Sequence, residues 1–247
     1  MVGDSCIVST INLLGIIAVL ILLIVLCWVF HIRIDLRSFF RRSFRVKRGL
    51  YGTYVFNGEQ GKGKTLSLAT YVYKHRKDNY IIFSNVYFNC LDSKFYQCFD
   101  DFDYVYKIIK AIDDKVIGYK SKDKRQVVII WDELFSLLNK STKLNKEIKS
   151  FLSQLRKRHI IFLTTCQSWP DIPLEFRRLC RFEIDCNCVP LISRSILINI
   201  YKDAERMKWD EIQQEHVAPI VWTRISQVNK CIADSYDTNQ TIKASNF

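Results

Sequence analysis

The longest apolar stretch of the chain lies near its amino terminus. No charged residue occurs between Cys6 and Phe30, and Asn12 is the only strongly polar side chain there. About 20 apolar residues cross a bilayer as a helix, and a buried core helix is rarely apolar all round for this length. The pattern predicts one retained transmembrane helix over about residues 7–30. A cleaved signal peptide is the main alternative, but no Lys or Arg precedes the stretch and its end lacks small residues.

Positive charge follows this stretch immediately, whereas only Asp4 precedes it. The basic residues are Arg33, Arg37, Arg41, Arg42, Arg45, Lys47 and Arg48. The positive-inside rule places the amino terminus outside and the rest of the chain in the cytoplasm. We therefore expect a single-pass protein of the inner or host cell membrane, with an anchor over 1–31 and a basic juxtamembrane linker over 32–50. Lipid headgroups are the expected partner of this linker, and DNA is the alternative.

Beyond the linker, short β-favouring runs alternate with helical patterns. Strands are expected at 53–56, 79–85, 127–131, 159–167, 181–185 and 195–201. Helices are expected from Lys64 onward, at 100–113 and over much of 134–158, with a polar break at 139–145. This alternation predicts an α/β fold with a mainly parallel sheet, that of a P-loop NTPase, over 51–240. A polar tail over 241–247 follows, and residues 186–247 predict little beyond strands.

Composition narrows the expected partners. The chain has 247 residues and a net charge of +12, which suits one α/β domain behind the anchor and favours nucleic acid or anionic lipid as a partner. Of the nine cysteines, only Cys186 and Cys188 lie close together, and no Cys/His set has the spacing of a zinc site. Reduced cysteines that act as small apolar residues are expected.

A glycine-rich loop separates the strand at 53–56 from the helix that begins at Lys64. Gly58, Gly63, Lys64 and Thr65 satisfy the phosphate-binding pattern in full. Glycines let backbone N–H groups turn inward around phosphates, and the helix amino terminus adds its dipole. Lys64 is expected to reach the β- and γ-phosphates, and Thr65 to ligate Mg²⁺. The predicted cofactors are ATP and Mg²⁺, and the nucleotide-binding residues are Gly58, Glu59, Gln60, Gly61, Lys62, Gly63, Lys64, Thr65 and Leu66.

Two carboxylates, Asp132 and Glu133, follow the apolar strand at 127–131. A run without polar interruptions is typical of a parallel strand buried on both faces. Ligands of such sheets bind at the carboxyl edge. Asp132 is expected to hold Mg²⁺, and Glu133 to polarise the attacking water. With the phosphate loop, this pair predicts an ATP hydrolase. A small-molecule kinase is less well supported, because many kinases have no base at this position.

The strand at 159–167 ends in polar residues. Thr165 and Gln167 are expected near the γ-phosphate, although Gln167 could equally be an ordinary loop residue. Arginines flank this strand: Arg156, Arg158, Arg177, Arg178 and Arg181. Arg156 and Arg158 are candidates for a catalytic arginine that acts across a subunit interface of a homo-oligomer. A solvated basic face or a DNA-contacting patch remains open for each.

These motifs together resemble the zonula occludens toxin-like assembly ATPases of filamentous phages, within the FtsK–HerA class of P-loop ATPases. The residues that carry the resemblance are Gly58 to Thr65, Ile82 to Asn85, Ile130 to Glu133, Arg156 to His159, Thr165 to Gln167, and Tyr236 to Thr238. The resemblance implies an oligomeric inner-membrane ATPase that drives extrusion of viral single-stranded DNA while coat or other assembly proteins join it.

One feature departs from the pattern of that group. Its typical members carry the ATPase first and the membrane span later, whereas the span predicted here comes first. That order is closer to conjugative coupling proteins, so a conjugation- or packaging-type translocase of viral or plasmid DNA stays an alternative. A membrane scaffold that binds ATP with little turnover is a third hypothesis, and Glu133 speaks against it.

Overall fold

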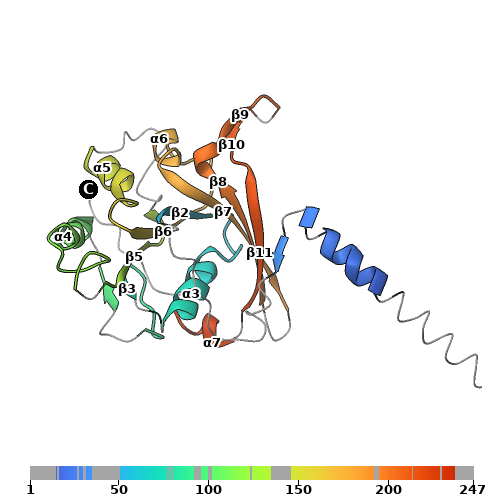
Figure 1. Ribbon diagram of the computed structural model, residues 1–247, viewed down its shortest axis with the longest axis horizontal. Coiled ribbons are helices and arrows are strands. Elements are labelled where there is room, and N and C mark those ends of the chain that lie inside the picture. The colour runs from blue at the N-terminus through green and yellow to red at the C-terminus, as the bar shows by residue number, and fades with distance from the viewer. Residues whose placement is uncertain are drawn as a thin grey trace, which may run out of the picture.

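The computed structural model describes residues 15, 17–26, 28–29, 32–34, 51–76, 78, 80–91, 96–99, 102–122, 124–134, 146–191, 195–212, 214–228 and 230–236. Within these residues one sheet of nine strands runs through the molecule in the order β1-β11-β8-β7-β2-β6-β5-β3-β4 (Figure 1). A separate pair, β9 (Lys208–Asp210) and β10 (Glu215–Val217), forms a hairpin that projects from the body.

Six neighbouring strands of the sheet run parallel. They are β7 (Cys180–Pro190), β2 (Gly52–Asn57), β6 (Ile160–Cys166), β5 (Gln126–Trp131), β3 (Tyr80–Ser84) and β4 (Tyr96–Cys98). This part confirms the predicted parallel sheet. Strand β6 lies between β2 and β5, so the strand before the phosphate loop and the strand before the carboxylates are not neighbours. Their carboxyl ends nevertheless meet at one edge of the sheet.

Both faces of the parallel part are covered. On β5, Val127 and Ile129 pack into one apolar cluster, whereas Val128 and Ile130 pack into the other. Helix α3 (Lys64–His75) covers the second face. The first face is covered by α4 (Phe102–Asp113), α5 (Lys146–Gln154) and α6 (Leu174–Arg177). Burial on both sides is the physical reason for the continuous apolar runs of these strands.

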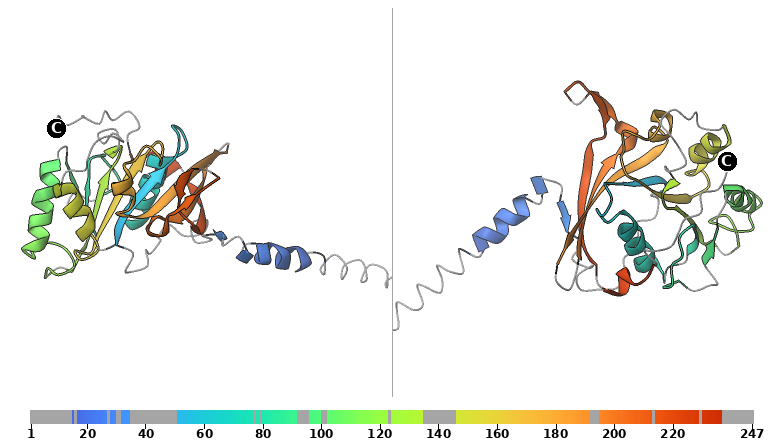
Figure 2. Two further views of the ribbon diagram at one scale, coloured as in Figure 1. Left: turned by 90° about the horizontal axis from the view of Figure 1, so that it is seen from above. Right: turned by 180° about the vertical axis from the view of Figure 1, so that it is seen from behind.

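Beyond β7 the sheet continues with two antiparallel strands, which the sequence did not predict. Strand β8 (Ser195–Asp203) returns beside β7, because the short connection between them allows only a hairpin. Strand β11 (Ile220–Val228) pairs antiparallel with β8, and in the reverse view of Figure 2 these strands rise on the side of the molecule away from α4. The 3₁₀ helix η2 (Ala204–Arg206) follows β8, and α7 (Lys230–Ala233) follows β11.

The amino-terminal predictions are only partly covered by the described residues. Residues 17–26 are helical and expose apolar side chains such as Leu22 and Ile24. In the described part of the chain, no helix is long and apolar enough to cross a membrane. The predicted span of about 7–30 includes residues outside that part, so the anchor and its orientation stay predictions. Strand β1 (Ile32–Ile34) belongs to the predicted linker, yet it pairs in parallel with β11 at the edge of the sheet.

Three further predictions concern segments that the structure does not describe. The linker residues 35–50, the break at 139–145 and the tail 241–247 lie outside the described residues. The helical segment predicted within 134–158 corresponds to α5. The cysteines that the structure describes form no disulfide with one another, and their reduced state stays a prediction.

Candidate nucleotide site

The phosphate loop lies between the end of β2 at Asn57 and the start of α3 at Lys64. Gly63 has φ +83°, a left-handed conformation that L side chains rarely adopt. A Cβ there would lie 2.9 Å from Cys188 Cβ and 3.0 Å from Leu197 Cδ2. Both neighbours belong to the β7–β8 hairpin, so the antiparallel part of the sheet packs directly against the loop. Only glycine fits at this position.

Backbone hydrogen bonds shape the loop and its junction with α3. The Lys62 amide donates to Glu59 O (3.2 Å), and the helical bonding begins with Ser67 N to Gly63 O (2.8 Å). No side chain caps the first turn of α3, so the amides at its start are available to a phosphate group. The Lys64 ammonium donates to Gly58 O (2.7 Å) and Glu59 O (3.0 Å) and therefore lies across the loop. The residues from Gly58 to Leu66 thus form the loop and the first turn of α3, and their binding of a nucleotide stays a prediction.

Asp132, directly after β5, connects the start of α3 to strand β6. It is 4 % exposed, and its Oδ2 accepts from Thr65 Oγ1 at 3.0 Å. Its Oδ1 accepts from Thr165 Oγ1 at 2.5 Å. Burial raises the pKa of Asp132, and the two hydroxyl groups and the charge of Lys64 oppose that rise. The structure thus brings Thr65 and Asp132 together, as the sequence predicted.

The oxygen donors of this pair fit Mg²⁺, a hard cation that prefers oxygen ligands. Asp132 is a buried carboxylate that accepts a hydrogen bond from a neutral hydroxyl at each of its two oxygens, and a nearby cation would stabilise its charged form. Among the described residues, no group of three His, Cys, Asp or Glu side chains could hold a metal ion. Mg²⁺ would therefore be held by Thr65 and Asp132 together with nucleotide phosphates and water.

Glu133 projects from a tight turn directly after β5. Its side chain is exposed and its backbone has φ +58°, an uncommon conformation for a non-glycine residue. Its amide donates to Thr165 Oγ1 at 2.8 Å. On the other side, the Asn85 side chain donates to Asp132 O (2.9 Å) and accepts from Asp132 N (2.7 Å). Two side chains from neighbouring strands therefore hold the backbone that positions Glu133.

Sequence reasoning missed the roles of Asn85 and Thr165. Thr165 was expected near the γ-phosphate, but it is 1 % exposed and its hydroxyl is used by Asp132 and Glu133. Asn85 had no assigned role. The available signal was a polar residue at the end of each strand that flanks the carboxylate strand. Burial, and after it the charge of Asp132, raise the pKa of Tyr236; the rest of its motif, 237–238, lies outside the described residues.

Gln167 follows β6 at the same edge and is exposed. Thr164 of β6 pairs with Trp131 of β5. Gln167 and Asp132 follow these two residues, so both lie at the same edge of the sheet. A contact between Gln167 and a γ-phosphate stays a prediction.

The two candidate catalytic arginines lie at the opposite edge. Arg158 makes two hydrogen bonds to the Asp113 carboxylate, both 2.7 Å, and Arg156 forms an ion pair with Glu205. Both arginines precede β6, whose seven residues at about 3.3 Å each separate them from the nucleotide edge by roughly 20 Å. Neither reaches the phosphate loop of its own chain. A role across a subunit interface stays a prediction.

The other three arginines have different surroundings. Arg177 is buried, Arg178 is exposed, and Arg181 donates to Tyr51 O at 3.1 Å.

No family model matches this sequence, and no curated protein matches it significantly. Among solved structures, the N-terminal domain of zonular occludens toxin from Neisseria meningitidis is similar at 16% identity and a TM-score of 0.45, over 75% of this chain and 98% of that one. The genome packaging NTPase B204 of Sulfolobus turreted icosahedral virus 2 is similar at 13% identity and a TM-score of 0.41, over 69% and 98%. The pCW3 conjugation coupling protein TcpA has 14% identity and a TM-score of 0.39, over 62% and 59%. At these levels the similarities alone assign neither function nor substrate, and the site geometry carries the interpretation.

Proposed function

We propose that this chain is a membrane-anchored ATP hydrolase that powers extrusion of viral DNA, single-stranded in the first instance, during virion assembly. The observation that carries the hydrolase part is that the ends of β5 and β6 and the start of α3 meet at Asp132. Its carboxylate accepts from Thr65 of the phosphate loop at 3.0 Å and from Thr165 of β6 at 2.5 Å. Cradle, metal-binding oxygens and an exposed glutamate thereby occupy one edge of the sheet.

Each part of this site has a chemical task. The loop amides and Lys64 bind the phosphates and stabilise the charge that develops on them. Thr65 and Asp132 would hold Mg²⁺, which when bound would neutralise phosphate charge. Glu133 accepts a hydrogen bond from the attacking water and orients it. A water-directed carboxylate supports hydrolysis over transfer to another acceptor.

The membrane and DNA parts rest on the sequence. The apolar stretch at 7–30 and the basic residues after it support a single-pass anchor with the ATPase on the cytoplasmic side. The net charge of +12 supports an anionic partner. The motifs shared with zonula occludens toxin-like ATPases support assembly on viral DNA by a homo-oligomer with coat proteins. The early position of the span supports a conjugation- or packaging-type translocase as the second candidate.

The hydrolase proposal is tested with Glu133→Gln, which keeps shape and removes the base. We expect ATP turnover to fall by about 100-fold or more, with the affinity for a fluorescent ATP analogue unchanged. Glu175→Gln is the matched control, because Glu175 is an exposed glutamate on α6, outside the nucleotide site. If the wild-type chain binds ATP but shows no turnover, the ATP-binding scaffold replaces the hydrolase.

The DNA part is tested by turnover with and without single-stranded DNA. Stimulation that fades as salt rises is expected, because contacts to DNA phosphates release counterions. Turnover that is indifferent to DNA at low salt would remove DNA pumping and leave an ATPase driven by protein partners.

A further inference from the structure

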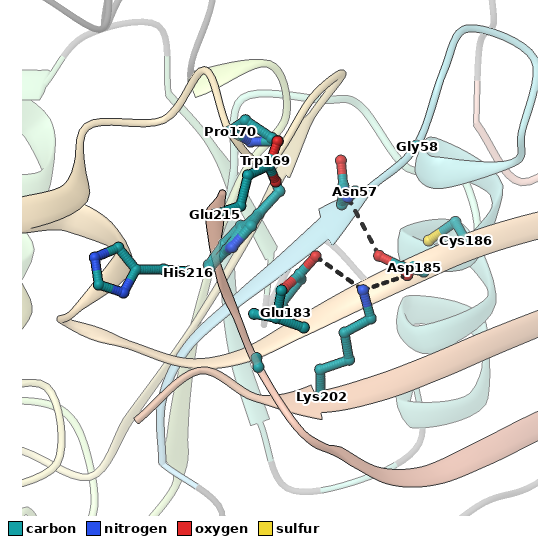
Figure 3. A pocket seen from close by; sticks show the side chains of 12 residues that line it. Asn57, Gly58, Trp169, Pro170, Glu183, Asp185, Cys186, Lys202, Glu215 and His216 are labelled. Atoms are coloured by element: carbon teal, nitrogen blue, oxygen red, sulfur yellow. Dashed lines mark hydrogen bonds and ion pairs between the residues drawn. The ribbon is translucent and has the colours of Figure 1, made fainter. Parts of the chain in front are cut away.

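A cavity of about 280 Å³ lies beside the first glycine of the phosphate loop (Figure 3). Strands β2, β7, β8 and β10 and the segment after β6 line it. Glu183 and Asp185 alternate along β7 with Phe182 and Ile184, which pack on the α3 side. The cavity therefore lies on the face of the sheet opposite α3. The side chains that line it have no role in the candidate nucleotide site.

The lining has more negative than positive groups. Lys202 Nζ lies 2.7 Å from Asp185 Oδ2 and 3.4 Å from Glu183 Oε1, and Figure 3 shows it between the two carboxylates. Glu183 is only 3 % exposed. The Asn57 amide donates to Asp185 Oδ1 at 3.2 Å. One lysine is thus shared by two carboxylates, and Glu215 adds a third acidic group to the wall. Such a lining disfavours an anion and favours a cation.

Trp169 adds a hydrogen-bond donor to the same cavity. The residue is 4 % exposed, and its indole N–H has no acceptor among the described residues. A buried donor without a partner costs about 1–3 kcal/mol, so a ligand with an acceptor at this point would offset that cost. In the described part of the chain no three His, Cys, Asp or Glu groups could hold a metal ion, which leaves an organic cation as the fitting class.

We propose that this cavity binds a guanidinium or primary ammonium group carried next to a hydrogen-bond acceptor, as in an arginine or lysine residue with its peptide carbonyl. The cation pairs with Asp185 and Glu183, and the carbonyl accepts from the Trp169 indole. Such a residue comes either from a second copy of this chain or from another basic peptide.

The ionisation of Glu183 gives this binding a pH dependence. Burial and the charge of Asp185 raise the pKa of Glu183 to about 7 against the opposing charge of Lys202. The other titratable and charged groups around the cavity are Arg177, Cys166, Cys180, Cys186, Glu215 and His216. A cation pairs with the ionised carboxylate, so the affinity rises by about tenfold between pH 6 and pH 8.

The test is calorimetric titration of the full-length chain, purified in a non-ionic detergent without nucleotide, with N-acetyl-arginine amide. N-acetyl-citrulline amide is the neutral probe of nearly the same shape. We expect saturable binding of one arginine amide per chain, tighter at pH 8 than at pH 6, and no binding of the citrulline amide in the same range. Absence of saturable binding, or equal binding of both probes, overturns the proposal.

Substitutions of residues that line the cavity test whether the arginine amide binds there. Asp185→Asn is expected to abolish it, and Trp169→Phe to weaken it by roughly 2- to 10-fold, the range of one hydrogen bond. Glu175→Gln is the matched control, because Glu175 is an exposed carboxylate on α6 that does not line the cavity. Circular dichroism checks that Asp185→Asn is folded. Unchanged affinity in both cavity variants would place the cation elsewhere and overturn the proposal.

Sedimentation then assigns the source of the cation. Dissociation of self-assembled chain by saturating arginine amide identifies a second copy as the source, and unchanged sedimentation identifies another peptide. Both measurements omit ATP, so their outcome is independent of the proposed hydrolysis.

Discussion

Two buried carboxylates of the same sheet, Asp132 and Glu183, have opposite kinds of partner. Asp132 is held by the hydroxyl groups of Thr65 and Thr165, which are neutral. Glu183 lies beside the ammonium group of Lys202. Burial raises the pKa of both carboxyl groups. Burial alone therefore does not make a carboxylate a binding site. Its neighbours determine whether it can still bind a cation.

The positions of the two residues explain this difference. Asp132 stands at the carboxyl end of a parallel strand, where neighbouring strand ends supply short polar side chains. Its charge remains available to a cation bound with phosphate. Glu183 stands within β7, where the antiparallel strand β8 places Lys202 opposite it in register. There the fold already supplies a cation, and Asp185 competes for it.

The largest effect is expected from a substitution of Lys64 in the candidate nucleotide site around Asp132. Lys64→Ala removes the ammonium group that lies across the loop. Turnover should fall by about 100- to 1,000-fold, the cost of losing one strong electrostatic contact to the transition state. Phosphate release measures it. Lys110→Ala is the control, since Lys110 is an exposed lysine on α4, away from the loop, and equal losses in both variants would contradict a specific role for Lys64.

Around Glu183, the effect is expected in the pH dependence of the unfolding free energy. The folded chain binds the Glu183 proton more tightly, because its pKa is about 7 instead of 4.5. This stabilisation is complete below pH 4.5 and is lost as the pH rises through 7. Between pH 5 and pH 8 the wild-type chain should lose about 2–3 kcal/mol relative to Glu183→Gln. Urea denaturation at both pH values measures the difference. Parallel losses in the two chains would show that Glu183 ionises normally.

A smaller effect is expected from Thr165→Val, which keeps the shape of the side chain. Asp132 loses one of its hydroxyl donors and the Glu133 amide loses its acceptor. Unfolding free energy should drop by about 1–2 kcal/mol, and turnover should fall with it. Thr164→Val is the control on the same strand. The Thr164 hydroxyl is buried without a hydrogen-bond partner among the described residues, so its removal should be neutral or stabilising.

The smallest effect is expected outside both regions, at the ion pair of Arg158 and Asp113. Asp113 is half exposed, so Arg158→Ala should change the unfolding free energy by less than about 1 kcal/mol. Thermal denaturation measures this change. Turnover should stay within about threefold of wild type, a difference below about 0.7 kcal/mol. A much larger loss of turnover in a stable variant would instead support action of Arg158 across a subunit interface.

Much of the parallel part was predictable from local sequence. The apolar run at 127–131 and the glycines from 58 to 63 each specify their own conformation, because burial on both faces and positive φ leave few alternatives. The pairing of Thr65 with Asp132 was also predictable, since strand ends of a parallel sheet share an edge. The role of Thr165 was not, because a hydroxyl at a strand end looks the same whether it faces a phosphate or a buried carboxylate.

The sequence by itself determined the phosphate loop, the carboxylate pair and the strands between them, because these depend on residue type and short spacing. The tertiary structure alone decided that β6 separates β2 from β5, that β8 and β11 extend the sheet antiparallel, and that Arg156 and Arg158 lie at the edge away from the loop. It also decided the cavity, where Trp169, Glu183 and Lys202 come from three separate segments. Contacts between distant segments depend on which strands pair, and no local pattern encodes that choice.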